Sequence, residues 1–207
     1  MKKVSLLLLV LLVCAGCATM GDNRGVMLDS YKMGKEAYEN GDYSQAFSLL
    51  QPAAQAGNPN AQYYLAIMYD FGRGTDTNHE EANVWYLKAA QQGQDDAQFN
   101  LAISYKTGEG IETDDEQAMY WLSKSAANGD EDAMYVLTRS YADNPQVQYN
   151  IAQIYRNGVT LHNDTETYPN EEDNINIAPD MEKYRYWLQQ AADNGFPGAA
   201  EELAAIK

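Results

Sequence analysis

The chain has 207 residues, of which 45% are hydrophobic and 21% are charged, and this length fits one domain. The formal net charge of −16 argues against binding to nucleic acid or to anionic lipid headgroups, because both are negatively charged themselves. A solvated acidic surface explains this charge, and a partner with a basic face is the alternative. The two cysteines, Cys14 and Cys17, both lie near the start, so no disulfide can link the helices further along the chain.

The first residues are predicted to form a secretion signal that is not part of the fold. Lys2 and Lys3 give a basic start, and residues 6–13 form an apolar run. This run is too short to cross a bilayer as an ordinary transmembrane helix, so it fits the apolar region of a cleaved signal. Removal of the signal also removes both lysines and leaves the mature chain more acidic.

The signal ends at a candidate site for lipid attachment. Ala15 and Gly16 precede Cys17, and this order resembles a bacterial lipobox, although Cys14 stands where that pattern prefers an aliphatic residue. The resemblance implies a signal peptide over residues 1–16, with a diacylglycerol and an N-acyl chain carried covalently by Cys17. Two or three acyl chains hold a protein firmly on a membrane, whereas a single chain holds it weakly. An ordinary signal with an incidental cysteine is the alternative.

Residues 17–26 are predicted to be a lipidated N-terminus followed by a short polar tether. Ala18 follows the cysteine in place of Asp, which resembles Gram-negative lipoproteins that are sorted to the outer membrane. We therefore expect a protein that is lipid-anchored to the outer membrane and faces the periplasm.

Two helices are expected next, over residues 28–40 and 44–56, with a turn at Gly41 between them. Pro52 falls inside the second helix. It is expected to kink that helix, because proline lacks the backbone donor and crowds the preceding turn.

A repeat of 36 residues dominates the centre of the chain, and a fixed period in this range is typical of a solenoid. The first copy contains Ala61, Leu65, Tyr69, Gly72, Gly74, Ala82, Trp85, Ala89, Ala90 and Gly93, and the second contains Ala97, Leu101, Tyr105, Gly108, Gly110, Ala118, Trp121, Ser125, Ala126 and Gly129. Each copy has two stretches with the spacing of one helical face. Glycines follow each stretch, where a left-handed residue ends a helix. Each copy therefore predicts a pair of helices.

These residues resemble the Sel-1-like repeat, an alanine-rich relative of the tetratricopeptide repeat. The shared pattern is A-x-x-x-L-A-x-x-Y-x-x-G-x-G, followed by A-x-x-W-(Y/L)-x-K-(A/S)-A-x-x-G. The resemblance implies an all-α fold over residues 27–207, built as a right-handed α/α superhelix of antiparallel helix pairs that holds another protein. Regular repeats are expected at about 27–57, 58–93 and 94–129.

The pattern becomes irregular over residues 130–195. Ala133, Leu137 and Tyr141 begin another copy, but Val147 restarts the first-helix pattern after only 14 residues. Two helices joined by so short a link must be antiparallel. Either the Val147 helix takes a second-helix position, or the stack is broken here, and both alternatives stay open at this point.

An insertion and a cap are expected near the C-terminus. Residues 160–179 are rich in Asn, Asp, Glu and Thr and are predicted to be a loop. A second-helix pattern returns around Trp187, with Tyr184 where earlier copies carry Ala. Residues 196–207 are predicted to form a short capping helix.

Motifs for enzyme chemistry are missing from the sequence. His79 and His162 are the only histidines, and neither has neighbours at metal-ligand spacing. No nucleophile elbow or phosphate-binding loop is present, and the glycine pairs follow predicted helices instead of strands. The acidic run 112–116 lacks calcium-binding spacing and is expected to cap the helix after it. We therefore expect no catalytic residue, no metal and no cofactor apart from the lipid.

The resemblance implies that the first helix of each pair lines a concave groove. The slots that face this groove lie two and six residues after the repeat alanine. They hold Tyr31, Lys35, Tyr63, Ile67, Phe99, Ile103, Tyr135, Arg139, Tyr149 and Gln153. Aromatic side chains are favoured anchors of protein interfaces, so we expect this row to bind a protein or peptide. Packing of the rings between helices is the alternative.

Other repeat residues are expected to form the core, namely Leu65, Tyr69, Trp85, Leu101, Tyr105, Trp121 and Trp187. The expected function is that of a scaffold or assembly factor for an envelope complex, such as one for polysaccharide export or secretion. The alternative is an immunity protein that neutralises a phospholipase-type toxin acting in the periplasm. A hydrolase is the third hypothesis.

Overall fold

The computed structural model describes residues 23–160 and 176–206, with side chains described over 30–158 and 178–206. The expectations for the signal peptide, for the lipid on Cys17 and for most of the tether lie outside these residues. His162 and most of the predicted insertion also lie outside them.

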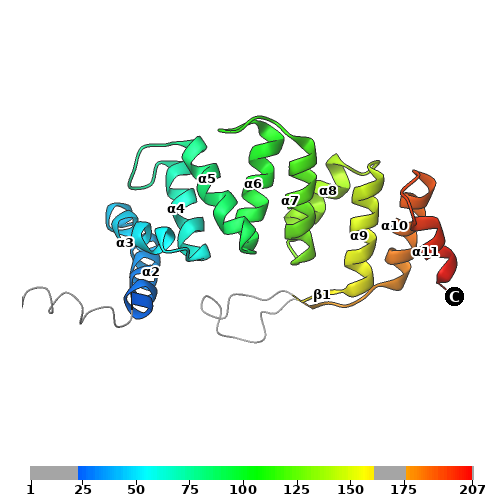
Figure 1. The fold of residues 1–207 in the computed structure, drawn as a ribbon, viewed down its shortest axis with the longest axis horizontal. Helices are drawn as coiled ribbons and strands as arrows, with labels where there is room; N and C mark the ends of the chain where they lie inside the picture. Colours follow the sequence, from blue (N-terminus) through cyan, green and yellow to red (C-terminus); the bar gives the residue numbers. More distant parts are fainter. Residues whose placement is uncertain (1–22, 161–175, 207) are drawn as a thin grey trace, which may run out of the picture.

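The described chain forms a stack of helices, which Figure 1 shows as an arch with α2 at one end and α11 at the other. The helices are α2 (Asn23–Glu39), α3 (Tyr43–Gln55), α4 (Pro59–Phe71), α5 (His79–Gln91), α6 (Asp95–Thr107), α7 (Asp115–Ala127), α8 (Glu131–Ser140), α9 (Pro145–Asn157), α10 (Met181–Asp193) and α11 (Ala199–Ala205). Two short strands, β1 (Val159–Thr160) and β2 (Asn176–Ile177), pair antiparallel at the ends of the predicted insertion. The prediction of an all-α solenoid is confirmed.

The helix boundaries follow from local capping chemistry. The side chain of Asn58 accepts a hydrogen bond from the backbone N–H of Ala61 at 2.9 Å, so it caps the start of α4. Asp114 does the same for α7 by accepting from Gln117 at 3.0 Å, which confirms the capping role predicted for the acidic run. α3 continues as one helix through Pro52.

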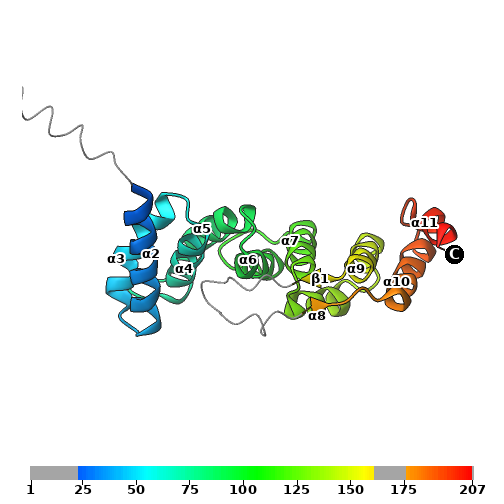
Figure 2. The ribbon, with the colours of Figure 1, turned by 90° about the horizontal axis from the view of Figure 1, so that it is seen from below.

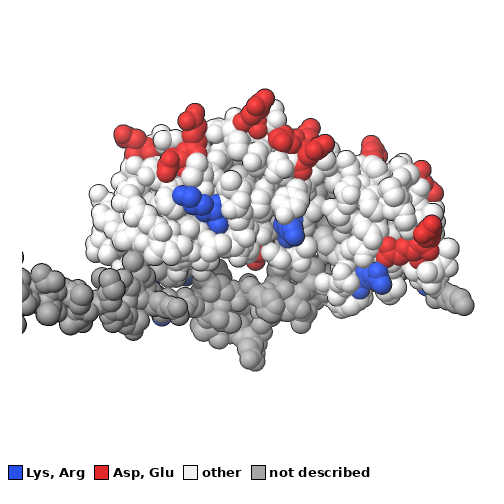
Figure 3. Space-filling model, in the orientation of Figure 1, with Lys and Arg blue, Asp and Glu red and all other residues white. Residues whose placement is uncertain are grey.

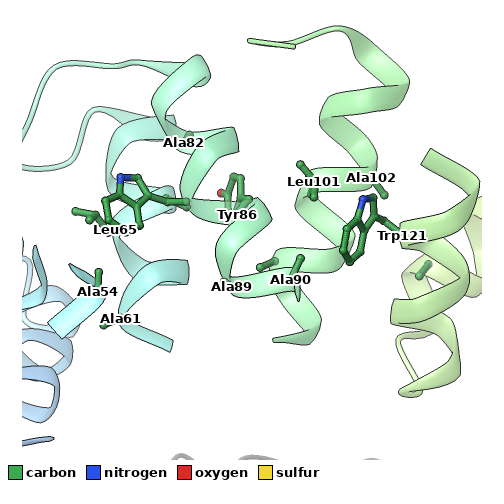
Figure 4. Close-up of a cluster of buried hydrophobic side chains, with 14 of the residues drawn as sticks. Ala54, Ala61, Leu65, Ala82, Tyr86, Ala89, Ala90, Leu101, Ala102 and Trp121 are labelled. Carbon is green, nitrogen blue, oxygen red and sulfur yellow. The ribbon is translucent and has the colours of Figure 1, made fainter. Parts of the chain in front are cut away.

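The core lies between the helices and is rich in alanine, which lets neighbouring helices approach closely (Figure 4). Leu65 and Leu101 are fully buried, and Trp85 and Trp121 are 8% and 7% exposed, as predicted. The remaining residues of the predicted core are only half-buried, namely Tyr69, Tyr105 and Trp187. Buried residues that were not named in the predicted core are Met68, Tyr86, Leu122 and Leu188.

The second glycine of each glycine pair allows one repeat to touch the next. Gly110 has a φ of 68°, and a Cβ placed there would lie 2.4 Å from the backbone carbonyl carbon of His79, the first residue of α5. Gly74 lies equally close to the backbone of Tyr43 at the start of α3. A side chain at either glycine would therefore push apart two consecutive repeats.

One backbone hydrogen bond closes each connection from a first helix to the following helix. The N-cap residue of the following helix donates its N–H to the carbonyl of the repeat tyrosine. The pairs in the regular repeats are Asn78 with Tyr69 at 2.8 Å and Asp114 with Tyr105 at 3.0 Å. The same bond joins Asn144 to Tyr141 at 3.0 Å and Asp180 to Tyr155 at 2.8 Å. α9 is therefore joined to α8 by a closed connection, but it pairs with α10 as a first helix does.

The packing of α9 shows how the irregular region is arranged. α8 has no second helix of its own, so α9 lies beside α7 and runs in the same direction. Figure 2 shows α5, α7 and α9 in one row, with α6 and α8 in the other. A helix with a first-helix sequence thus runs in the direction of the second helices but packs against α10 and α7 instead of α8, so the regular alternation of helices is interrupted here.

Candidate functional site

His79 makes structural contacts that join consecutive repeats. Its Nδ1 lies 2.7 Å from Oδ1 of Asp70 on α4, and its Nε2 lies 3.3 Å from Glu109 in the loop before α7. The hydroxyl of Tyr86 donates to the second oxygen of Asp70 at 3.2 Å, and burial raises the pKa of this tyrosine. Within residues 30–158 and 178–206, no group of three or more His, Cys, Asp or Glu side chains is arranged to hold a metal ion.

Tyr31 does not line an open groove, so the expectation for this residue is corrected. Its side chain is only 3% exposed and belongs to the buried core cluster. The ring lies 6.4 Å from the ring of Tyr64, which packs over it from α4. Tyr31 therefore packs between the first pair of helices, α2 and α3, and the second pair, α4 and α5.

Tyr63 and Phe99 keep part of their surface while they pack on the core. The ring of Tyr63 lies 5.8 Å from Tyr64 and 6.3 Å from Tyr86, and its hydroxyl bonds to the carboxylate of Asp96 on α6. Burial raises the pKa of Tyr63, and the negative charge of Asp96 raises it further. The ring of Tyr63 therefore links neighbouring helices, and Phe99 packs against the core while it stays partly exposed.

Tyr135 and Arg139 form the most accessible part of the predicted row. Tyr135 on α8 is 63% exposed, and Cζ of Arg139 lies 6.0 Å from the centre of its ring. Ile67 and Ile103, at the matching positions of α4 and α6, are half-buried. The row thus runs over α4, α6 and α8. Its side chains on α4 and α6 are half-buried, and it ends on α8 at the exposed pair Tyr135 and Arg139.

Tyr149 does not continue this row, because α9 lies in the row of α5 and α7. Its ring stacks on Phe196 with the centroids 4.3 Å apart and the planes 19° from parallel. Its hydroxyl bonds to Glu202, and the amide of Gln153 also donates to this carboxylate at 3.2 Å. The expectation for Tyr149 is therefore corrected: it holds the C-terminal cap in place.

The structure reveals a second concave surface that was not expected from the sequence. A groove of about 720 Å³ lies between α7 and α9, with Tyr120 and Lys124 on one wall and Asn150 and Ile154 on the other. The signal that could have identified it is a series of side-chain amides along one face of α9, beginning at Gln146.

Charge is distributed unevenly around this part of the molecule. Figure 3 shows acidic side chains gathered along one long edge, and few charged side chains over the middle of the same face. The second helices begin at this edge, and their first turns carry Glu80 and Glu81 in α5 and Asp115 and Glu116 in α7. Lys88 and Lys124 lie in the last turns of the same helices, where a positive charge is favourable.

A solenoid of antiparallel helix pairs, with accessible aromatic and apolar side chains along its helices, defines a helical-repeat protein of the kind that binds other proteins. The chain belongs to the Sel1 repeat family, whose repeat matches residues 30–58, 59–94, 95–130 and 175–196. Proteins with Sel1 repeats are typically scaffolds for protein interactions. The match omits α8 and α9, which are the helices that depart from the regular pattern. Among the helices of the described chain, none has both the length and the apolar character needed to cross a bilayer.

The chain is similar to a solved Sel1 repeat protein from Oxalobacter formigenes, with 28% identity and a TM-score of 0.47, over 84% of this chain and 58% of the other. It is also similar to c5321, a protective antigen present in uropathogenic Escherichia coli strains, with 26% identity and a TM-score of 0.49, over 86% of this chain and 40% of that one. A segment of 58 residues is 42% identical to the chitin synthase regulator SKT5 of Saccharomyces cerevisiae, covering 28% of this chain and 8% of the regulator. The chain therefore spans less than two thirds of each of these relatives.

Proposed function

We propose that this protein is a lipoprotein of the outer membrane that faces the periplasm and holds a protein or peptide partner there, as a scaffold or assembly factor of an envelope complex. The binding surface is the first-helix face, which we define as Tyr63, Ile67, Phe99, Ile103, Tyr135 and Arg139. The lipid on Cys17 confines the partner to the membrane surface.

The observation that carries this proposal is the exposed pair Tyr135 and Arg139 at the end of a row of half-buried apolar side chains. Tyrosine and arginine are enriched among the residues that contribute most to binding at interfaces. A tyrosine that is 63% exposed in the free protein has much surface to bury against a partner. The half-buried residues at matching positions of α4 and α6 extend this surface across three repeats.

The charge of the chain supports a partner with a basic face. A net charge of −16 attracts such a partner over long range and speeds association, and salt weakens this effect. We infer that the protein acts by binding without turnover, since the described histidine is engaged in contacts between repeats. No contact or surface of the described residues favours the alternative of a toxin antidote, so that alternative is not proposed.

The test is capture of the partner by the full chain in detergent micelles, followed by mass spectrometry of the bound proteins. The double variant Tyr135→Ala with Arg139→Ala is expected to lose the partner while its circular dichroism stays unchanged. Tyr186→Ala is the matched control, because Tyr186 on α10 is 58% exposed and lies outside the first-helix face. Undiminished capture by the double variant, or an equal loss in the control, would show that the first-helix face is not the binding surface.

A further inference from the structure

The groove between α7 and α9 exists because the fourth repeat lacks a second helix. In the regular repeats a first helix of the opposite row separates two helices of the same row. Here the short link between α8 and α9 brings a first-helix sequence next to α7 (Figure 2). The resulting groove of about 720 Å³ lies within the size range of ligand-binding sites, which is roughly 300–1,000 Å³.

The two walls of the groove are fixed to each other before any ligand binds. The side-chain amide of Asn150 on α9 donates to the hydroxyl of Ser123 on α7 at 3.0 Å. Gln146 donates to the oxygen of Asn150 at 2.9 Å. A groove that is already formed binds without the cost of ordering its walls.

Three side-chain amides of α9 line this groove, namely Gln146, Asn150 and Asn157, while the amide of Gln153 donates to Glu202 of the C-terminal cap. The first two are four residues apart and the third is seven residues further on, so together they span about 16 Å along the helix axis. Each amide has two N–H donors and an acceptor oxygen. Asn150 uses one donor and one acceptor in the wall contacts, so it retains a further donor and a further lone pair.

The donors and lone pairs that these amides retain suit an extended peptide better than a helix. A peptide in an extended conformation advances about 6.6–6.8 Å every two residues and presents unpaired N–H and C=O groups at that spacing. These groups need partners once they leave water. A helix satisfies its backbone internally and would leave the amides of α9 without a match.

The wall formed by α7 indicates which side chains such a peptide carries. Met119 and Tyr120 line the groove, and Tyr120 is 50% exposed, so an apolar side chain can be buried against it. Glu116 lies in the acidic first turn of α7 at one end of the groove. A basic side chain fits that end by charge complementarity.

We propose that the groove between α7 and α9 binds an extended segment of a protein partner. The segment spans about five residues, since the amide row is about 16 Å long. It places its backbone on the amides of α9, an apolar side chain on Tyr120 and a basic side chain beside Glu116. The inference rests on the proposed function in that the occupant is a protein, but it uses a surface separate from the first-helix face.

The test starts with a phage-displayed library of random peptides of about eight residues, selected on the full chain in detergent micelles. Enriched peptides are expected to combine apolar residues with Lys or Arg and to contain no helical pattern. Their affinity is then measured by fluorescence polarisation against three groove variants, Tyr120→Ala, Asn150→Leu and Glu116→Gln. Each variant is expected to weaken binding by about tenfold. Tyr186→Ala is the matched control, since Tyr186 is exposed to a similar extent as Tyr120 and lies outside both the groove and the first-helix face, and it is expected to leave peptide affinity unchanged.

A second measurement tests recognition of the peptide backbone. Methylation of every second backbone nitrogen of the peptide removes N–H donors without changing the side chains. Two such peptides are made, one methylated at the odd and one at the even positions, and one of the two is expected to lose binding. Three outcomes would overturn the inference. They are failure to enrich any peptide, groove variants that bind the peptide as tightly as the unaltered protein does, and binding that survives methylation in both registers. Loss of the natural partner in the Tyr135 and Arg139 double variant would still support the proposed function in that case, so the two failures are distinguishable.

Discussion

The side-chain amide of Asn194 donates a hydrogen bond at 3.0 Å to the side chain of Gln148, which is 46 residues earlier in the chain. Gln148 is 2% exposed and itself donates to the carbonyl of Ala142 at 2.7 Å. One glutamine thus ties the end of α10 and the segment after α8 to the start of α9.

The same arrangement occurs in the regular repeats. Gln62 accepts from Gln92 at 2.7 Å and donates to the carbonyl of Ala54 at 3.1 Å. Gln98 donates to the carbonyl of Ala90 at 3.3 Å. Met134 occupies the matching position of α8, which is the helix without a second helix of its own. The buried glutamine is therefore shared by the first helices of three pairs, α4, α6 and α9.

We predict that Gln148→Ala destabilises the protein by about 1–3 kcal/mol, because it leaves the carbonyl of Ala142 and the amide of Asn194 without partners. The measurement is the free energy of unfolding in urea. A double-mutant cycle with Asn194→Ala isolates the pairwise part. Gln189→Ala is the control, since Gln189 is exposed on α10, and its effect is expected within about 0.5 kcal/mol. A loss no larger than that of this control would contradict the role assigned to Gln148.

Gly110→Ala is predicted to destabilise the protein more than Gly93→Ala. Both glycines have positive φ, at 68° and 91°, so both variants lose about 1–2 kcal/mol through the left-handed backbone. Only at Gly110 would the new methyl group collide with the backbone of His79, and we expect about 1–3 kcal/mol more there. Thermal unfolding of the two variants compares them directly. Equal melting temperatures would mean that the repeats do not approach each other at this glycine.

The docking of the C-terminal helix is predicted to weaken in acid through Glu202. Burial raises the pKa of this carboxyl, but hydrogen bonds from Tyr184, Gln153 and Tyr149 and the charge of Arg156 outweigh burial, and the pKa is lowered from its ordinary value of 4.5. The guanidinium of Arg156 lies 2.7 Å from the carboxylate of Glu202.

Since the pKa is lower in the folded state, the stabilisation by Glu202 is present above the unfolded-state pKa and is lost as the pH falls through the folded-state value. The variant Glu202→Gln is therefore expected to lower stability at neutral pH and to reduce the dependence of stability on pH below about 4.5. Urea unfolding at a series of pH values between neutral and acid measures both effects. An unchanged pH profile would show that this carboxylate is not coupled to folding.

Cys17→Ser is predicted to abolish lipid attachment and to release the protein from the membrane fraction, because serine offers no thiol for the diacylglycerol. Metabolic labelling with palmitate, followed by fractionation, measures both outcomes. Cys14→Ser is the matched control and is expected to keep the label, since it leaves the second cysteine intact. Retention of the label by the Cys17 variant would place the lipid elsewhere.

Local patterns in the sequence were sufficient to predict much of the fold. The spacing of Ala61, Leu65 and Tyr69 predicted α4, and the acidic run ending at Glu116 predicted the start of α7. These features act over one or two helical turns, so neighbouring residues alone decide them. The same is true of the glycines that end helices, whose positive φ values follow from local backbone geometry.

The candidate site was predictable only in part. Tyr135 and Arg139 lie on an accessible face, as their register indicated, but Tyr31 occupies the same register and is buried. The difference arises because Tyr64 of α4, the next first helix, packs over Tyr31, whereas the helix after α8 lies in the row of α5 and α7. Register along a helix tells which face a side chain is on, and it does not tell what covers that face.

The sequence by itself determined the repeat and the pairing of helices in the regular repeats, because these depend on short-range spacing and capping. Only the tertiary structure decided that α9 lies beside α7, that Tyr149 stacks on Phe196, and that a groove opens between two helices of one row. The physical reason is that a short link between α8 and α9 reverses the alternation of helices, and the consequences depend on contacts between residues far apart in the chain.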